Sequence, residues 1–155
     1  MNIFEIKDVT FGYRNDLILK KLTFDISEGE FLSVTGPNGT GKSTLLRLMS
    51  GFLKPSEGSV KFMGQKLDSV NQSELARKLA FILQDSFINF PYTVREIVSM
   101  GRFPFLGTFQ NESKDDKNII NIAMEKTGVF NLAERPVTEL SGGERQRVMI
   151  ARALA

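Results

Sequence analysis

Hydrophobic and polar residues alternate in some parts of this chain and run together in others, and the two patterns predict different strands. The segments 3–9 and 22–26 are rich in β-favouring residues, and the second alternates between apolar and polar side chains, which is typical of half-exposed antiparallel strands. Continuous apolar runs at 31–35 and 79–83 predict buried strands of a parallel sheet, because such strands are covered on both faces. The pattern therefore favours an α/β fold with a sheet of mixed direction.

Helices are predicted from helical spacing of apolar residues and from end signals. Thr93 with Glu96 and Ser141 with Glu144 form capping boxes, in which a hydroxyl and a carboxylate satisfy the first amide groups of a helix. The segment 101–109 is too rich in Gly and Pro for a helix. The predicted helices cover residues 45–49, 72–78, 93–100, 113–127 and 141 onward, and a further strand covers 59–62. Gly51 closes the first helix, Ser73 caps the second, and Ser113 and Gly128 begin and stop the fourth. Val148, Ala151 and Leu154 share one face of the last helix.

Composition excludes several classes of chemistry. The 155 residues are 41% hydrophobic and 25% charged, which suits one soluble globular domain. The net charge of +2, without a basic block, argues against nucleic acid as a partner. The absence of Cys and His excludes disulfides, thiolate zinc sites and imidazole bases. No signal-peptide pattern and no apolar run near eighteen residues occurs, which predicts a cytoplasmic chain that does not span a membrane.

The segment from Gly36 to Thr44, GPNGTGKST, carries the strongest chemical signal. Its glycines at positions 36, 39 and 41 allow positive φ angles and close approach of a ligand to the backbone. Lys42 supplies a flexible charge for the β and γ phosphates, and the Ser43 hydroxyl is placed to ligate Mg²⁺. An apolar run before the segment and a helix after it give the required strand, loop and helix. The segment predicts a nucleoside triphosphate site, with an ordinary glycine-rich turn as the alternative.

A second segment, LSGGERQR at 140–147, opens the last helix. Glycine in a helix interior costs roughly 1 kcal/mol relative to Ala, so Gly142 and Gly143 in the first turn break a local rule inside a well-capped helix start. Bare amide groups at a helix N-terminus can receive an anion closely. Two interpretations stay open at this point, an anion site and a cap loosened by glycine.

The two segments together resemble the Walker A loop and the signature motif of ATP-binding-cassette (ABC) ATPases, and Gln84, at the end of the second apolar run, resembles the Q-loop glutamine of that family. The resemblance runs over the whole chain. It implies a P-loop NTPase core with an antiparallel N-terminal β unit and an inserted helical subdomain. The implied division is an ATP-binding core over 1–84, a helical subdomain over 85–139, and the signature motif with its helix over 140–155.

The resemblance assigns roles residue by residue. Tyr13 would stack on adenine, with a packed turn tyrosine as the alternative, and Gln84 would contact Mg²⁺ or the attacking water, with a solvent-facing glutamine as the alternative. Ser43 and Gln84 are the implied Mg²⁺ ligands. Besides Tyr13, the implied ATP-binding residues are Gly36, Asn38, Gly39, Gly41, Lys42, Ser43 and Thr44. The signature residues Ser141, Gly142, Gly143 and Glu144 would face the ATP of a second protomer in a head-to-tail dimer.

A finer resemblance points to the ATPases of iron-siderophore, haem and cobalamin importers. It rests on the segments 76–80, 93–96 and 101–104 around Gln84, whereas Phe105 stands where those ATPases commonly have His. The implied protein couples ATP to import and lies at the inner face of the cell membrane through permease subunits. The implied substrate is an iron-siderophore or a related metal chelate.

Six aromatic residues crowd the region that docks membrane subunits in this family. They form either an apolar patch that faces a partner or the core of the helical subdomain. The six are Phe87, Phe90, Tyr92, Phe103, Phe105 and Phe109.

The sequence stops at Ala155, before the Walker B carboxylates and the switch His that the family would place next. The expectation is a truncated chain that binds Mg-ATP weakly and hydrolyses it negligibly alone. Two alternatives remain. One is a non-catalytic fragment. The other is a soluble ABC ATPase of DNA repair or chromosome maintenance, against which stands the lack of a long coiled coil between Gln84 and Ser141.

Overall fold

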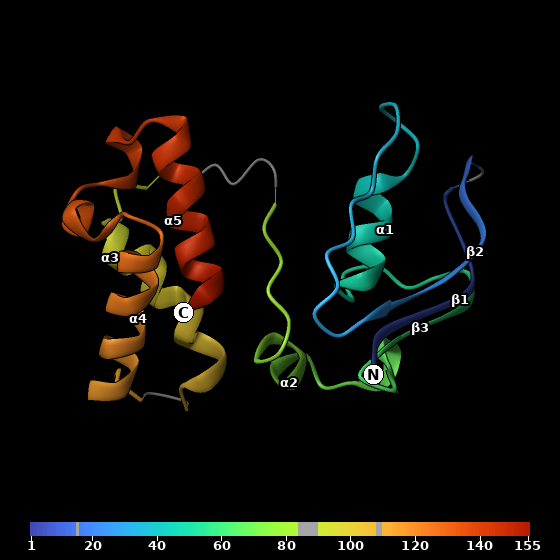
Figure 1. The fold of residues 1–155 in the computed structure, drawn as a ribbon, viewed down its shortest axis with the longest axis horizontal. Helices are drawn as coiled ribbons and strands as arrows, with labels where there is room; N and C mark the ends of the chain where they lie inside the picture. The colour runs from blue at the N-terminus through green and yellow to red at the C-terminus, as the bar shows by residue number, and fades with distance from the viewer. Residues whose placement is uncertain (15, 84–89, 108–109) are drawn as a thin grey trace. The chain divides into compact units, whose positions relative to one another are not determined.

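Two compact units, Met1–Gln72 and Ser73–Ala155, make up the chain in the computed structural model, which describes residues 1–14, 16–83, 90–107 and 110–155 (Figure 1). Residues 73–83 belong to the second unit. The division of function at positions 84 and 139 stays a prediction.

The first unit is an antiparallel sheet with one helix. Strands β1 (Asn2–Tyr13), β2 (Asp16–Ser27), β3 (Glu57–Phe62) and β4 (Gln65–Lys66) are ordered β2-β1-β3-β4, and every pair is antiparallel. Helix α1 (Lys42–Met49) contacts β3. The predicted antiparallel N-terminal unit and the strand at 59–62 are therefore confirmed, and α1 begins within the predicted phosphate-binding segment.

The core of this unit lies between the inner face of the sheet and α1. Ile6 and Val9 of β1 are fully buried, as is Leu48 of α1. The rings of Phe4 and Phe62, which are paired across β1 and β3, lie 5.0 Å apart. Alternation along the strands thus selects the buried face, as the sequence indicates.

Two predicted strands are wrong. Residues 31–35 and 79–83 form neither strand nor helix, and Phe31 is 94% exposed. A continuous apolar run becomes a buried strand only where neighbouring strands supply hydrogen-bond partners on both sides. None of the four described strands pairs with either segment.

The second unit is helical. Its main elements are α2 (Gln72–Ala76, which begins at the boundary), α3 (Val94–Ser99), the 3₁₀ segment η2 (Met100–Phe105), α4 (Lys114–Lys126) and α5 (Gly142–Leu154). Shorter 3₁₀ turns are η1 (Leu67–Ser69, in the first unit), η3 (Phe130–Leu132) and η4 (Val137–Glu139). All of the predicted helices are present.

Helix caps agree with the sequence at three of the predicted starts. Thr93, Ser113 and Ser141 each accept a hydrogen bond from the third helical amide and complete a capping box. Gly128, with φ of 68°, follows α4 as predicted. Ser73 is a wrong assignment, because α2 already begins at Gln72 and places Ser73 inside the first turn.

The prediction that residues 101–109 contain no helix is also wrong as far as Phe105, where η2 ends. A 3₁₀ segment is short and tolerates Gly and Pro better than a long α-helix does. Gly101 is required here, because a methyl group at that position would overlap the carbonyl oxygen of Arg152 in α5. The glycine that argued against a helix instead allows η2 to lie directly on α5.

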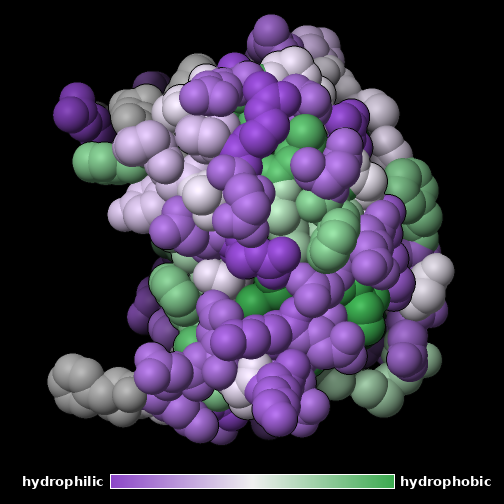
Figure 2. Space-filling view, turned by 90° about the vertical axis from the view of Figure 1, so that its left-hand side faces the viewer, coloured by the Kyte–Doolittle hydropathy of each residue, from purple (hydrophilic) through white to green (hydrophobic). Residues whose placement is uncertain are grey.

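Helices α3, α4 and α5 pack against one another around one apolar core. Its fully buried members include Val94, Ile97, Val98, Ile120, Met124, Val129, Val137, Val148 and Ala151. Leu154, predicted to share the face of Val148 and Ala151, is exposed. The face of this unit that Figure 2 shows is mostly hydrophilic with small apolar areas. In the described part of the chain, no helix combines the length and the apolar character that crossing a bilayer would need.

Candidate functional site

The glycine-rich segment forms an irregular loop before α1. Gly36, Gly39 and Gly41 have φ angles of 150°, 82° and 92°, which L-residues with a Cβ rarely adopt. Asn38 and Gly39 are exposed at the loop, and nothing lies within 4 Å of a methyl group added at Gly39. The backbone conformation that the sequence predicts is therefore present.

Lys42 folds back over this loop. Its Nζ donates hydrogen bonds to the carbonyl oxygens of Gly36 and Pro37, both at 2.7 Å. The Thr40 hydroxyl also donates to the Pro37 oxygen, at 2.9 Å. The ammonium group is thus held above the loop by its carbonyl groups, an arrangement that the sequence motif alone does not specify.

The start of α1 differs from the starts of α3, α4 and α5. Gly41 occupies the N-cap in a left-handed conformation, no side chain caps the helix, and its first turn contains no acidic residue. The other three helices have a hydroxyl and a carboxylate bound to their first amide groups. The first amide groups of α1 are therefore left for another acceptor, next to a positive helix end.

The two hydroxyl residues after Lys42 have different surroundings. Thr44 is buried, whereas Ser43 is exposed and its hydroxyl makes no hydrogen bond to any residue that the structure describes. No group of three or more carboxylates that could hold a metal exists among the described residues. A divalent cation fits this loop only as a partner of bound phosphate, with Ser43 as a protein ligand.

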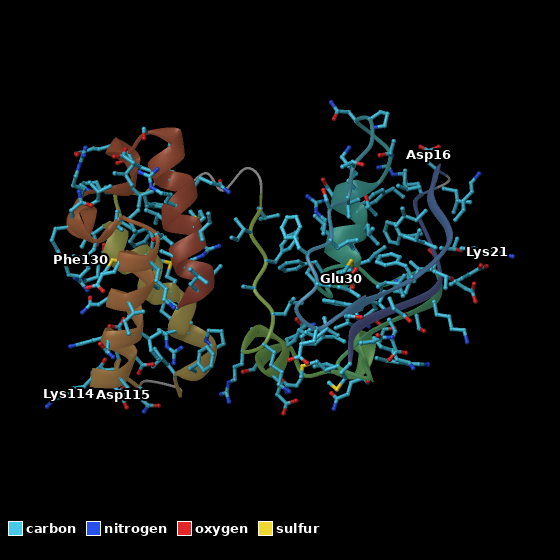
Figure 3. All side chains as sticks on the ribbon, in the orientation of Figure 1. Asp16, Lys21, Glu30, Lys114, Asp115 and Phe130 are labelled. Atoms are coloured by element: carbon cyan, nitrogen blue, oxygen red, sulfur yellow. The ribbon has the colours of Figure 1, made fainter. Side chains whose placement is uncertain are left out.

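Tyr13 is the last residue of β1 in the same unit. Asp16, labelled in Figure 3, is the first residue of β2. The Tyr13 ring is 43% exposed and meets the ring of Phe11 edge-on, at 5.0 Å and 87°. One edge of the Tyr13 ring is packed, as expected for the alternative of a packed turn tyrosine, and much of the ring is exposed to solvent. Stacking on a base stays a prediction.

The segment at the start of α5 is folded as a capping box. The Ser141 amide and hydroxyl donate to Glu144 Oε2 at 2.8 Å and 2.7 Å, and the Glu144 amide donates to Ser141 Oγ at 3.3 Å. These hydrogen bonds from Ser141 lower the pKa of Glu144. Gly142 and Gly143 are exposed. The cap is confirmed, and binding of an anion there stays a prediction.

The Q-loop prediction cannot be placed in the structure, because Gln84 lies outside the described residues, as do Phe87 and Phe109 of the aromatic set. Phe90, Tyr92, Phe103 and Phe105 are exposed and do not belong to the core of the helical unit. The core interpretation is therefore wrong for these four rings.

A partly buried ion pair in the helical unit was missed by sequence reasoning. Arg102 Nε lies 2.9 Å from Asp116 Oδ1, and Arg102 Nη1 donates to the Ala155 carbonyl oxygen at 2.6 Å. Hydrogen bonds from Ser113, and then from Arg102, lower the pKa of Asp116 to about 2. The Arg102 guanidinium also lies 4.0 Å from the centre of the Phe105 ring. The spacing from Ser113 to Asp116 signals the cap, but no local pattern identifies Arg102 as the partner.

Comparison with known proteins identifies a family for most of the chain. Residues 19–155 match the sequence profile of the family described as "ABC transporter". The iron(3+)-hydroxamate import ATP-binding protein of Bacillus subtilis (strain 168) is 38% identical over 155 residues, which are 100% of this chain and 58% of that protein. The cobalamin import ATP-binding protein of Halobacterium salinarum is 44% identical over 138 residues, 89% of this chain and 34% of that protein. The chain thus spans about a third to somewhat over half of these relatives.

Solved structures give the same result. A metal-chelate type ABC transporter in an inward-facing conformation matches with a TM-score of 0.82 and 32% identity, over 98% of this chain and 55% of that one. A bacterial Atm1-family ABC exporter with ATP bound matches with a TM-score of 0.81 and 31% identity, over 97% of this chain and 27% of that one. The predicted fold class is confirmed by these matches.

Proposed function

This chain belongs to the ABC transporter family, and on that premise we propose that it is the ATP-binding part of a transporter subunit, with the loop 36–41 and the start of α1 as its triphosphate site. One observation carries the proposal. The start of α1 has neither a capping side chain nor an acidic residue, and a lysine and three left-handed glycines surround it.

The chemistry follows from the donors. Phosphate oxygens entering the loop would accept hydrogen bonds from the free amide groups of α1, and Lys42 Nζ would exchange the carbonyl oxygens of Gly36 and Pro37 for them. Ser43 would hold Mg²⁺, which would supply positive charge to neutralise the phosphates when it is bound. Tyr13 would stack on the base.

We assign the start of α5 to the ATP of a second protomer. Ser141, Gly142 and Gly143 present exposed polar and backbone groups at a helix N-terminus, which suits a phosphate. Glu144 would hold this turn in shape. The proposal includes a head-to-tail dimer of such subunits and, from the family, contact of Gln84 with Mg²⁺ or water.

Turnover by this polypeptide alone is proposed to be slow. No acidic residue occurs from Phe31 to Ser56, so the loop and α1 contribute no carboxylate to orient water or metal. ATP binding is the activity that its own residues support.

Import of an iron-siderophore or a related metal chelate is the transport that we propose, in association with permease subunits at the inner face of the membrane. The support is the similarity to the iron(3+)-hydroxamate and cobalamin import proteins. The similarity to an exporter indicates that the fold alone does not fix the direction.

The test is equilibrium binding of Mg-ATP measured by calorimetry on the 155-residue chain. Lys42→Ala should weaken binding at least about tenfold, because a desolvated charge contact of about 1.4 kcal/mol is lost. Lys54→Ala is the matched control, since it removes the same charge from an exposed position outside the loop. Equal effects of the two substitutions would show that the loop is not the site.

A further inference from the structure

The last glycine of the loop lies against the second strand of the sheet. A methyl group added at Gly41 would lie 2.7 Å from Ile18 Cγ2 and 2.9 Å from Leu19 Cδ2, whereas nothing lies within 4 Å of one added at Gly39. Ile18 and Leu19 are both half-buried. Strand β2 therefore contacts the loop at its junction with α1 and leaves the loop tip free.

The same strand pair carries Tyr13. Leu19 is the partner of Phe11 across β1 and β2, and the buried ring of Phe11 holds the Tyr13 ring edge-on at 5.0 Å. The two strands approach closely here, because a methyl group at Gly12 would overlap the carbonyl oxygen of Asp16. A continuous series of contacts thus runs from Tyr13 through Phe11 and Leu19 to Gly41. In Figure 1 the start of β2 and the start of α1 lie at the same end of this unit.

We propose that Ile18 and Leu19 are positioning residues that fix the spacing between the Tyr13 ring and the phosphate loop, and so favour a ligand with a base at one end and a triphosphate at the other. The inference rests on the proposed function of the loop. Preorganised spacing matters only for a ligand that engages both ends, since it lowers the ordering cost of the second contact. A bare triphosphate needs the loop alone.

The test compares Mg-ATP with Mg-tripolyphosphate by calorimetry. Ile18→Ala should weaken ATP binding about tenfold and change tripolyphosphate binding less than about twofold, because only the base contact is displaced. Ile18→Val keeps the γ-methyl group that faces Gly41 and should bind both ligands as the natural chain does. Leu17→Ala is the neighbouring control, since Leu17 is 50% exposed.

Each outcome decides the question. Unchanged ATP affinity in Ile18→Ala overturns the spacing role. An equal loss of affinity for both ligands also overturns it, because such a loss shows that Ile18 only supports the fold of the loop. If far-UV circular dichroism shows that Ile18→Ala is unfolded, Leu19→Ala removes the other contact with Gly41 and should weaken the binding of ATP but not of tripolyphosphate. An equal loss of affinity for both ligands in Leu19→Ala also overturns the spacing role. A natural chain that binds neither ligand refutes the proposed function, and the spacing role falls with it.

Discussion

Gly41→Ala is a sharp test of the loop geometry, because two separate effects act at this position. An L-residue at a φ of 92° costs about 1–2 kcal/mol. Its methyl group would also press on Ile18 and Leu19 at 2.7 Å and 2.9 Å, and such overpacking costs about 1–3 kcal/mol. Together the two effects should lower the free energy of unfolding of the first unit by about 2–5 kcal/mol.

Gly39→Ala separates the two effects. Gly39 has a φ of 82°, and nothing lies within 4 Å of an added methyl group, so this variant should lose only the conformational part. Urea unfolding followed by circular dichroism, with hydrogen exchange of the α1 amides as a local measure, gives the difference between the variants. The double variant Ile18→Ala/Gly41→Ala should recover part of the steric loss. Equal losses for Gly39→Ala and Gly41→Ala would refute the contact between β2 and the loop.

Three further predictions concern the helical unit. The pKa of Asp116 is lowered to about 2, so the contribution of this carboxylate to stability is complete above the usual aspartate pKa near 4 and is lost as the pH falls toward 2. Urea unfolding from pH 6 to pH 2 should show this loss of stability, and the Asp116→Asn variant should show a smaller dependence on pH. Met124→Ala should cost about 2–5 kcal/mol in the same assay, whereas Ile122→Ala, on the exposed side of α4, should cost under about 1 kcal/mol; similar values would contradict the assigned core. Gly101→Ala should be destabilising, because its methyl group meets a carbonyl oxygen of α5, and Gly142→Ala, in open space within α5, should be neutral or stabilising; thermal unfolding that ranks them in the opposite order would exclude the close contact.

Local signals in the sequence predict most of this fold. Capping boxes at Thr93 and Ser141 identify helix starts because the two bonded residues are three positions apart. Positive φ at the loop glycines follows from the motif in the same way. These features depend on neighbours in the chain and are therefore readable without the structure.

Features that depend on distant residues were missed or wrong. The apolar run at 79–83 has the composition of a strand, but composition does not supply a pairing partner. Arg102 and Asp116 meet across two elements, and Gly41 meets Ile18 across a turn and a loop. The proposed site follows a similar division, since its motifs are local, whereas the contacts of Gly41 with Ile18 and Leu19 of β2 join residues far apart in the sequence.

The hydrogen bonds of Lys42 make ligand entry an exchange reaction. The ammonium group already has two carbonyl acceptors at 2.7 Å, so an anion gains only the difference between its own oxygens and those two. A singly charged ion with one accessible oxygen replaces one acceptor and leaves the other bond to be broken without compensation. A polyanion with several oxygens replaces both and also reaches the amide groups of α1. We therefore expect the loop to discriminate by the number of oxygens that arrive together, so that common monovalent anions in the solvent compete poorly for it.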